Sequence, residues 1–224
     1  MASLPEHLTA APMGRERLSR ETLTEHQRAR LLDAAIGVFA KRGYQETTID
    51  NLVAAAKSSV GGFYALFENK EDCFLALYDR TVAEVREKIE VATSGSSDWA
   101  ERALLGLRVL LVVFDAEPLK ARIALVEVQT AGTEARARHQ ATIDSAVKWL
   151  GAGRGLYPAA AELPPTFEQA AVGGVAWFLQ QRLESSAHES VEELFADTTQ
   201  LLLEPIFGAR KLSALRRSAL SAVG

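Results

Sequence analysis

The sequence TIDNLVAAAKSSVGGFY, residues 48–64, contains two short apolar segments separated by a polar turn. The first segment carries its apolar side chains at helical spacing, and the hydroxyls of Thr47 and Thr48 can cap its start. The turn falls at residues 57–58, and Ser59 can cap the second segment. This order predicts a helix-turn-helix, in which two short helices pack at an angle and the second helix faces outward.

Two adjacent glycines, Gly61 and Gly62, stand directly before two aromatic residues in the second helix. Glycine destabilises a helix by about 1 kcal/mol relative to alanine, so two adjacent glycines in a helix indicate a role other than helix stability. We expect both to let the backbone approach DNA, with Phe63 turned inward and the Tyr64 hydroxyl donating to a phosphate. Lys70, at the start of the next helix, is expected to bind another phosphate. Plain packing of a Gly-aromatic segment is the competing interpretation.

Apolar residues recur at three- and four-residue spacing along the chain, whereas strand-like alternation is nowhere sustained. Capping signatures at Thr24, Asn69 and Thr166 mark three helix starts. The pattern predicts an all-α protein of about nine helices, with a three-helix N-terminal domain followed by a larger C-terminal helical bundle. The expected helices are about 24–42, 48–56, 59–64, 70–91, 98–115, 118–130, 133–150, 166–185 and 187–207.

The 224 residues carry a net charge of −4, and 48% of them are hydrophobic, which is ordinary for a soluble globular protein. The acidic balance does not exclude nucleic acid, because seven basic residues face four acidic ones between Arg15 and Arg42. No apolar run is long enough for a membrane span, and the N-terminus does not resemble a signal peptide. Cys73 is the single cysteine, so a disulfide framework is excluded and a cytoplasmic protein is expected.

No catalytic, metal or cofactor signature stands out. The four histidines lack metal-ligand spacing, and no Ser/His/Asp or paired-carboxylate pattern is present. GAGRG at 151–155 is similar to a dinucleotide-binding loop, but it follows a predicted helix rather than a strand. We interpret it as a helix end and linker, and expect no enzyme activity, no cofactor and no metal.

The whole order from residue 28 to 77 resembles the DNA-binding domain of the TetR family of transcriptional regulators. The resemblance is carried by Ala34, Ala35, Phe39, Gly43, Tyr44, Thr47, Thr48, Ile49, Leu52, Ala56, Ser59, Gly61, Phe63, Tyr64, Phe67, Lys70 and Glu71. It implies a homodimer whose recognition helices enter successive major grooves of a pseudo-palindromic double-stranded operator. The candidate DNA contacts are Thr47, Thr48, Lys57, Ser59, Val60, Gly61, Gly62, Tyr64 and Lys70.

Three residues depart from the family pattern. Lys57 stands where the turn usually has glycine, and Ser58 where it has a small apolar residue. Leu66 replaces a polar or aromatic residue that often touches the DNA backbone. The departures imply a slightly different turn, an added charge beside the DNA and the loss of one phosphate contact.

The resemblance also implies that the C-terminal bundle binds a small molecule and mediates dimerisation. The expected divisions are a disordered arm over 1–20, the helix-turn-helix domain over 21–70, the ligand-binding and dimerisation domain over 71–210, and a tail over 211–224. The expected function is a repressor released from its operator by a largely apolar small molecule. The alternative is an interaction or regulatory module of the same fold without small-molecule sensing.

Candidate pocket and interface residues follow from side-chain type. An apolar pocket with a few polar groups would fit Phe114, Glu127, His139 and Trp177, with core packing as the alternative. Among them, Glu127 lies amid apolar residues, where a carboxylate must find a partner. The last two predicted helices would pair with their copies in a four-helix bundle, or else pack within the chain. The candidate interface residues are Gly173, Gly174, Phe178, Leu194, Leu201 and Leu202.

Overall fold

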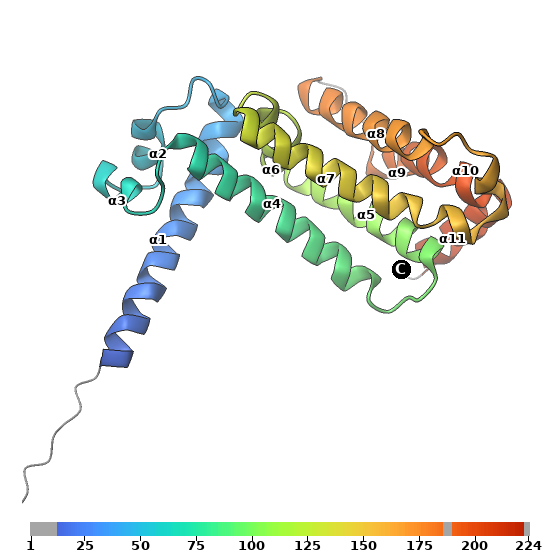
Figure 1. Ribbon diagram of the computed structural model, residues 1–224, viewed down its shortest axis with the longest axis horizontal. Helices are drawn as coiled ribbons and strands as arrows, with labels where there is room; N and C mark the ends of the chain where they lie inside the picture. The colour runs from blue at the N-terminus through green and yellow to red at the C-terminus, as the bar shows by residue number, and fades with distance from the viewer. Residues whose placement is uncertain (1–12, 186–189, 222–224) are drawn as a thin grey trace, which may run out of the picture.

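A computed structural model describes residues 13–185 and 190–221 of the chain, with the side chains of residues 13–20 and 217–221 left aside. Eleven α-helices and three 3₁₀ turns account for the regular structure of the described residues, which contain no strand. The predicted all-α class is confirmed, with more helices than the nine expected. Figure 1 shows a small helical unit at one end and a long bundle extending from it.

The N-terminal unit consists of α1 (Met13–Arg42), α2 (Ile49–Ala55) and α3 (Val60–Tyr64). Helix α1 begins well before the capping signature at Thr24, because the preceding residues continue the helix without a break. Its N-terminal half extends away from the rest of the molecule (Figure 1). Of the arm predicted over 1–20, residues 1–12 lie outside the described residues, and the remainder belongs to α1.

Helix α4 (Lys70–Thr93) joins the N-terminal unit to the bundle and shares a core with it. Phe39 of α1 and Phe74 of α4 are fully buried, with ring centroids 5.2 Å apart in an edge-to-face arrangement. Tyr44, in the loop after α1, packs against both rings. The first part of α4 is therefore a structural member of the N-terminal domain as well as the first helix of the bundle.

The remaining elements form the bundle (Figure 1). They are α5 (Trp99–Ala116), α6 (Pro118–Leu125), η1 (Glu127–Gln129), α7 (Thr133–Gly151), η2 (Arg154–Leu156), η3 (Pro158–Glu162), α8 (Phe167–Glu184), α9 (Val191–Leu202), α10 (Glu204–Phe207) and α11 (Ala209–Ser221). Their core combines buried residues of α5, α8 and α9 with the C-terminal elements.

The bundle differs from the sequence prediction at three places. The helix predicted over 118–130 ends at Leu125, and a separate 3₁₀ turn follows it. The helix predicted over 187–207 is split at Leu203, just before Pro205. The predicted tail contains α11, which docks on the bundle because its Leu212 is buried in the second core.

The connection between α7 and α8 is held by one arginine. Arg154 donates from Nε and Nη2 to the two carboxylate oxygens of Glu168, at 2.9 and 2.8 Å. Its guanidinium also donates to the carbonyls of Ala160, Leu163 and Pro164. Five N–H groups thus make five hydrogen bonds, which is the full donor capacity of a guanidinium. Through Arg154, the segment GAGRG therefore fixes the connection between α7 and α8, which agrees with its interpretation as a linker.

Candidate nucleic-acid interface

Both short helices of the helix-turn-helix begin at the capping residues that the sequence indicates. The Thr48 hydroxyl accepts from the backbone N–H of Asn51, whose side chain accepts in return from the N–H of Thr48. The Ser59 hydroxyl accepts from the N–H of Gly62 at 3.0 Å and starts α3 in the same way. These hydrogen bonds fix the first turn of each helix.

The turn between α2 and α3 places Lys57 in the left-handed region, with φ of 48°. This backbone conformation costs an L-residue roughly 1–2 kcal/mol and is usually given to glycine. The N–H of Ser58 then donates to the carbonyl of Val53 at 2.9 Å, which closes the end of α2. The lysine therefore occupies the same backbone geometry that glycine would adopt, and its side chain is exposed.

Helix α3 has one buried and one exposed face. Phe63 is fully buried, and Phe67 beyond the helix is also buried beneath the guanidinium of Arg28, 4.4 Å from the ring centroid. On the opposite face, Val60 is 43% exposed and Tyr64 is 55% exposed. The prediction that Phe63 points inward and Tyr64 outward is confirmed.

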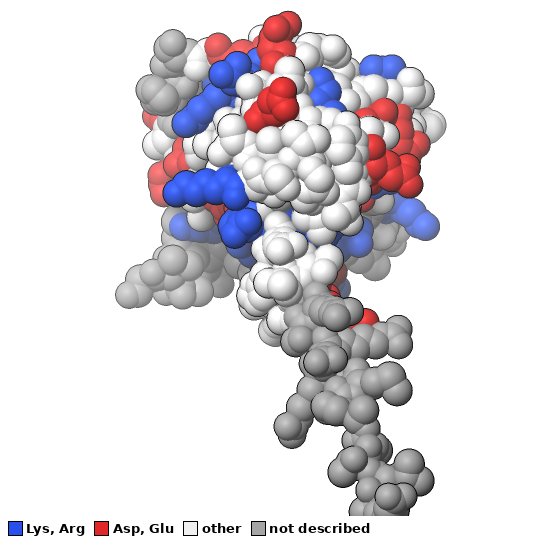
Figure 2. Space-filling model, turned by 90° about the vertical axis from the view of Figure 1, so that its left-hand side faces the viewer, with Lys and Arg blue, Asp and Glu red and all other residues white. Residues whose placement is uncertain are grey.

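Figure 2 looks onto the end of the molecule that carries α2 and α3. Uncharged surface fills the centre of this face, lysine and arginine gather mainly on its left side, and acidic residues lie above and to the right. Positive charge thus borders the uncharged centre on one side, as a surface that meets a phosphate backbone beside a groove requires.

The two glycines of α3 have different surroundings. A Cβ atom at Gly61 would have only the Ser59 hydroxyl nearby, at 4.0 Å, so this position is open to the outside. A Cβ at Gly62 would lie 2.9 Å from the Ser58 hydroxyl and 3.2 Å from that of Ser59. Gly62 therefore accommodates the hydroxyls of Ser58 and Ser59. Only Gly61 leaves the backbone on the outer face of α3 uncovered by a side chain.

Two predicted DNA contacts are used inside the protein instead. Thr47 is buried, and its hydroxyl donates to the carbonyl of Gly43 at 2.7 Å, so its side chain does not reach the surface. The Lys70 ammonium donates to the carbonyls of Tyr44 and Thr47, both at 2.9 Å, and lies over the Tyr44 ring. Burial lowers the pKa of Lys70 from its usual value. Both side chains therefore hold the α1–α2 loop. This corrects the prediction that Thr47 contacts DNA and that Lys70 binds a phosphate.

Glu127 reaches the same loop from the larger domain. Its side chain is buried, with Oε2 accepting from the N–H of Tyr44 at 2.8 Å and Oε1 accepting from Nε of Arg122 at 3.1 Å. Gln45 adds a bond from Nε2 to the carbonyl of Thr130 at 2.7 Å. The buried carboxylate therefore has its partners at the domain junction. Tyr44 and Arg122 were missed by the sequence reasoning, because no local pattern shows which loop a buried glutamate will meet.

Of the other pocket candidates, His139 and Trp177 lie together, and Phe114 does not lie with them. Phe114 lies in the core of the bundle on α5. His139 and Trp177 line a groove of about 230 Å³ between α7 and α8, together with Gly173. Burial lowers the pKa of His139 from its usual value, so the imidazole is favoured in its neutral form.

Of the dimer candidates, Leu194 is fully buried in the chain's own core and Leu202 is nearly so. This corrects the assignment of Leu194 to a surface between subunits. Gly173 and Leu201 are exposed, as is the pocket candidate Trp177, and a Cβ at Gly173 would meet nothing within 4 Å. The exposed residues lie on α8 and α9, the two helices from which the interface was predicted, while Gly174 and Phe178 are half-buried on α8.

The geometry defines a helix-turn-helix domain on a helical bundle, and comparison with known proteins shows which family model the N-terminal domain matches. Residues 31–77, 47 of the 224, match the family model described as bacterial regulatory proteins, tetR family. The resemblance of the N-terminal segment to the TetR-family helix-turn-helix domain is confirmed by this match.

A curated relative is the fatty acid metabolism regulator protein of Bacillus subtilis (strain 168), 28% identical over 83 residues, or 37% of this chain and 40% of that protein. The chain thus spans about two fifths of the length of the curated relatives it matches. These relatives are named as regulators.

Solved structures extend the likeness to the bundle. The fatty acid degradation regulator FadR from Bacillus halodurans has a TM-score of 0.68 at 20% identity, over 79% of this chain and 94% of that one. AibR, solved in complex with isovaleryl coenzyme A and operator DNA, has a TM-score of 0.65 at 18% identity, over 81% of this chain and all of that one, 100%. At these identities the likeness establishes the shared fold.

Membrane-spanning helices and clusters of metal ligands are both absent from the part of the chain that the structure describes. Among the described residues, no helix has both the length and the apolar character that crossing a lipid bilayer requires. Nor do three or more His, Cys, Asp or Glu side chains come together as metal ligands anywhere in residues 13–185 and 190–221.

Proposed function

We propose that the chain is a cytoplasmic, sequence-specific DNA-binding regulator, which acts as a dimeric repressor and is released from its operator by a small molecule. The observation that carries DNA binding is the exposed pair Val60 and Tyr64 on α3, a helix anchored from behind by the buried Phe63. Apolar and hydroxyl groups on a thin, outward helix suit base edges and phosphates in a major groove. The family of the N-terminal domain supports the same conclusion.

Dimerisation through α8 and α9 is the second part of the proposal. Trp177 is 63% exposed and Leu201 is 49% exposed, and an exposed tryptophan beside small residues is typical of a protein interface. Gly173 lies one helical turn before Trp177 and lets a second helix approach closely. A two-fold pairing of these helices would set the separation of two recognition helices on one operator.

Ligand control is the third part. A relative of the same fold, AibR, was solved with isovaleryl coenzyme A and operator DNA, which supports a sensor role for the bundle. Helix α4 starts at Lys70, which holds the α1–α2 loop, and continues into the bundle. A ligand that shifts α4 would therefore move the recognition helix. A coupling free energy of about 1–3 kcal/mol would change operator occupancy 5- to 150-fold.

Fluorescence anisotropy with labelled DNA from upstream of the chain's own gene tests DNA binding. We expect Tyr64→Ala to weaken binding by roughly 1–3 kcal/mol, because the side chain leaves the contact surface. Val60→Ala should also weaken binding, whereas Val112→Ala should not, because that valine is equally exposed but lies on α5 in the bundle.

If Tyr64→Ala and Val60→Ala bind the DNA as tightly as the unchanged protein, the docking face assigned to α3 is wrong.

Sedimentation of Trp177→Glu tests the dimer separately, since a carboxylate buried at a two-fold interface should produce monomers.

A further inference from the structure

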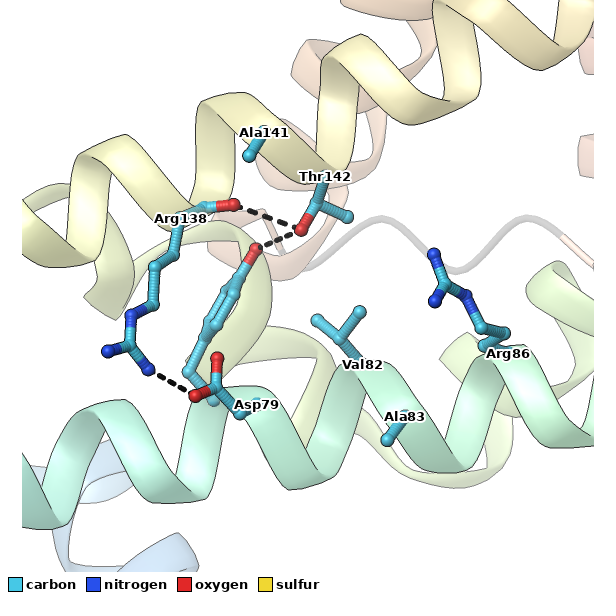
Figure 3. A pocket seen from close by; sticks show the side chains of 8 residues that line it. Asp79, Val82, Ala83, Arg86, Arg138, Ala141 and Thr142 are labelled. Atoms are coloured by element: carbon cyan, nitrogen blue, oxygen red, sulfur yellow. Dashed lines mark hydrogen bonds and ion pairs between the residues drawn. The ribbon is translucent and has the colours of Figure 1, made fainter.

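A groove of about 300 Å³ lies between α4 and α7 (Figure 3). The two helices are joined at one end, where the Tyr78 hydroxyl donates to Oγ1 of Thr142 at 3.0 Å. Tyr78 is 2% exposed and lines the groove. The groove is at the lower end of the size range of small-molecule sites, enough for a charged group and a short apolar segment.

Two arginines line the groove. Neighbouring carboxylates compensate the charge of one of them, and the charge of the other has no such partner among the described residues. Arg138 of α7 pairs with Asp79 of α4 and with Glu134 one turn before it, so its charge is compensated. Arg86 of α4 is exposed and makes no hydrogen bond or ion pair with any residue that the structure describes. Figure 3 shows its guanidinium rising from α4 toward α7, on the far side of Val82 from the Arg138–Asp79 pair.

Small apolar side chains lie between the two arginines, beside Thr142, whose hydroxyl is bonded to that of Tyr78. Val82 and Ala83 lie on the α4 side of the groove, and Ala141 lies on the α7 side (Figure 3). A guanidinium with free donors at the end of an apolar strip matches a molecule with an anionic group and a hydrocarbon segment. The chain as a whole is acidic, so general electrostatic attraction does not account for anion binding there.

We propose that this groove binds an amphipathic anion, with a carboxylate or phosphate on Arg86 and the adjoining apolar segment over Val82, Ala83 and Ala141. The inference rests on the proposed sensor function and specifies the ligand class and the site. Its regulatory consequence follows from position, because the same helix α4 carries Arg86 and, at its other end, the loop-holding Lys70. A ligand bound between α4 and α7 alters the spacing of these helices and so the placement of the N-terminal domain.

Isothermal titration of the full-length protein with four probes tests the proposal: octanoate, octanoyl coenzyme A, free coenzyme A and 1-octanol. We expect the carboxylate or the acyl coenzyme A to bind more tightly than 1-octanol, and the better of the two identifies the anion. Arg86→Gln should weaken that binding roughly 10- to 100-fold, the loss expected for a charged hydrogen bond. The matched control Arg102→Gln, an exposed arginine of α5, should bind as the unchanged protein does.

Ala141→Trp fills the groove from an exposed helix position and should abolish binding without unfolding the chain, as circular dichroism can verify. The proposal is overturned if 1-octanol binds as well as both anions, if none of the probes binds, or if Arg86→Gln and Ala141→Trp both retain full affinity. Operator affinity measured without any probe should be unchanged in Arg86→Gln. Failure of DNA binding in the unchanged protein would therefore count against the proposed function, separately from the groove.

Discussion

At the scale of single residues, neighbouring positions with the same side chain have different tasks. Gly61 presents an open backbone on the outer face of α3, whereas Gly62 accommodates the hydroxyls of Ser58 and Ser59. Thr47 and Thr48 differ in the same way, because Thr47 is buried and closes a loop while Thr48 caps a helix at the surface. Sequence patterns assign such pairs one shared role, and the structure separates them.

The two glycines can be distinguished by alanine substitution. Gly61→Ala should raise the free energy of unfolding by about 0.5–1 kcal/mol, because alanine loses less backbone entropy and meets no close neighbour. The same change should weaken operator binding, since the new methyl group points outward from the face of α3 that we propose to meet DNA. Urea denaturation and fluorescence anisotropy measure the two effects.

Gly62→Ala is the matched control for Gly61→Ala. Its methyl group displaces the Ser59 hydroxyl from its cap, which costs about 1 kcal/mol and cancels the entropic gain. Equal stability gains in both variants, or full operator affinity in Gly61→Ala, would show that the two positions do not differ as described.

At the scale of elements, capping and periodicity predict most helices well. The caps at Thr48, Ser59 and Asn69 form as predicted, because each depends on residues three positions away in the chain. The predicted cap at Thr166 is absent, since no side-chain hydrogen bond starts α8. There the preceding segment is fixed by Arg154, a contact between distant positions that local patterns do not reveal.

In the candidate site, too, features that depend on local sequence could be predicted, and contacts between distant residues could not. The outward Tyr64 and the inward Phe63 could be predicted, because the helical period alone places them on opposite faces. The use of Lys70 as a loop clamp could not, because it depends on where the carbonyls of Tyr44 and Thr47 lie after folding. Glu127 was correctly expected to need a partner, but only one of its two partners, Arg122, is near in sequence, and the other is a backbone N–H 83 positions away.

The pair Arg154–Glu168 should make the α7–α8 connection sensitive to acid. The hydrogen bonds from Arg154 lower the pKa of Glu168 below its ordinary value of 4.5. A carboxyl with a lowered folded pKa stabilises the fold above its unfolded pKa, and this contribution is lost as the pH falls through the folded pKa. Glu168→Gln should therefore be less stable than the unchanged chain at pH 7, with the difference shrinking below about pH 4.5.

Thermal unfolding of both proteins across this pH range measures the difference. Because all other acidic groups are shared by the two proteins, the change in their difference reports on residue 168 alone. A stability difference that stays constant between pH 7 and pH 3 would mean that the charge of the Glu168 carboxylate contributes nothing to the stability of the fold.

At the scale of the whole molecule, α4 and the α1–α2 loop join the two domains. Arg80 of α4 pairs with Asp33 of α1 at 2.8 Å, and Glu84 one turn later pairs with Lys120 of α6 at 2.6 Å. The buried Glu127 adds a contact from η1 to the loop. The N-terminal domain is thus held to the bundle at two separate places, so a displacement of either α4 or α6 reaches it.

Removing the Glu127 carboxylate should loosen this connection. Glu127→Ala leaves the N–H of Tyr44 without its acceptor, at a cost of about 1–3 kcal/mol in the free energy of unfolding. The amides of residues 43–48 should exchange faster with deuterium than in the unchanged protein. Glu127→Gln retains an oxygen that can accept from Tyr44 and should restore most of the protection.

Equal exchange in the alanine and glutamine variants would show that the Tyr44 bond is not what holds the loop. A fall in protection spread evenly over all helices would instead indicate general destabilisation.

The bonds from Glu127 and Lys70 end on main-chain atoms of the α1–α2 loop, the N–H of Tyr44 and the carbonyls of Tyr44 and Thr47. Main-chain atoms are the same whatever side chains the loop and the recognition helix carry. If the chain functions as proposed, its operator preference can therefore change through substitutions on α3 without disturbing the contacts between the loop and the bundle. A chimera that receives a foreign recognition helix between residues 58 and 66 should thus keep its response to the original ligand while reading a new DNA sequence.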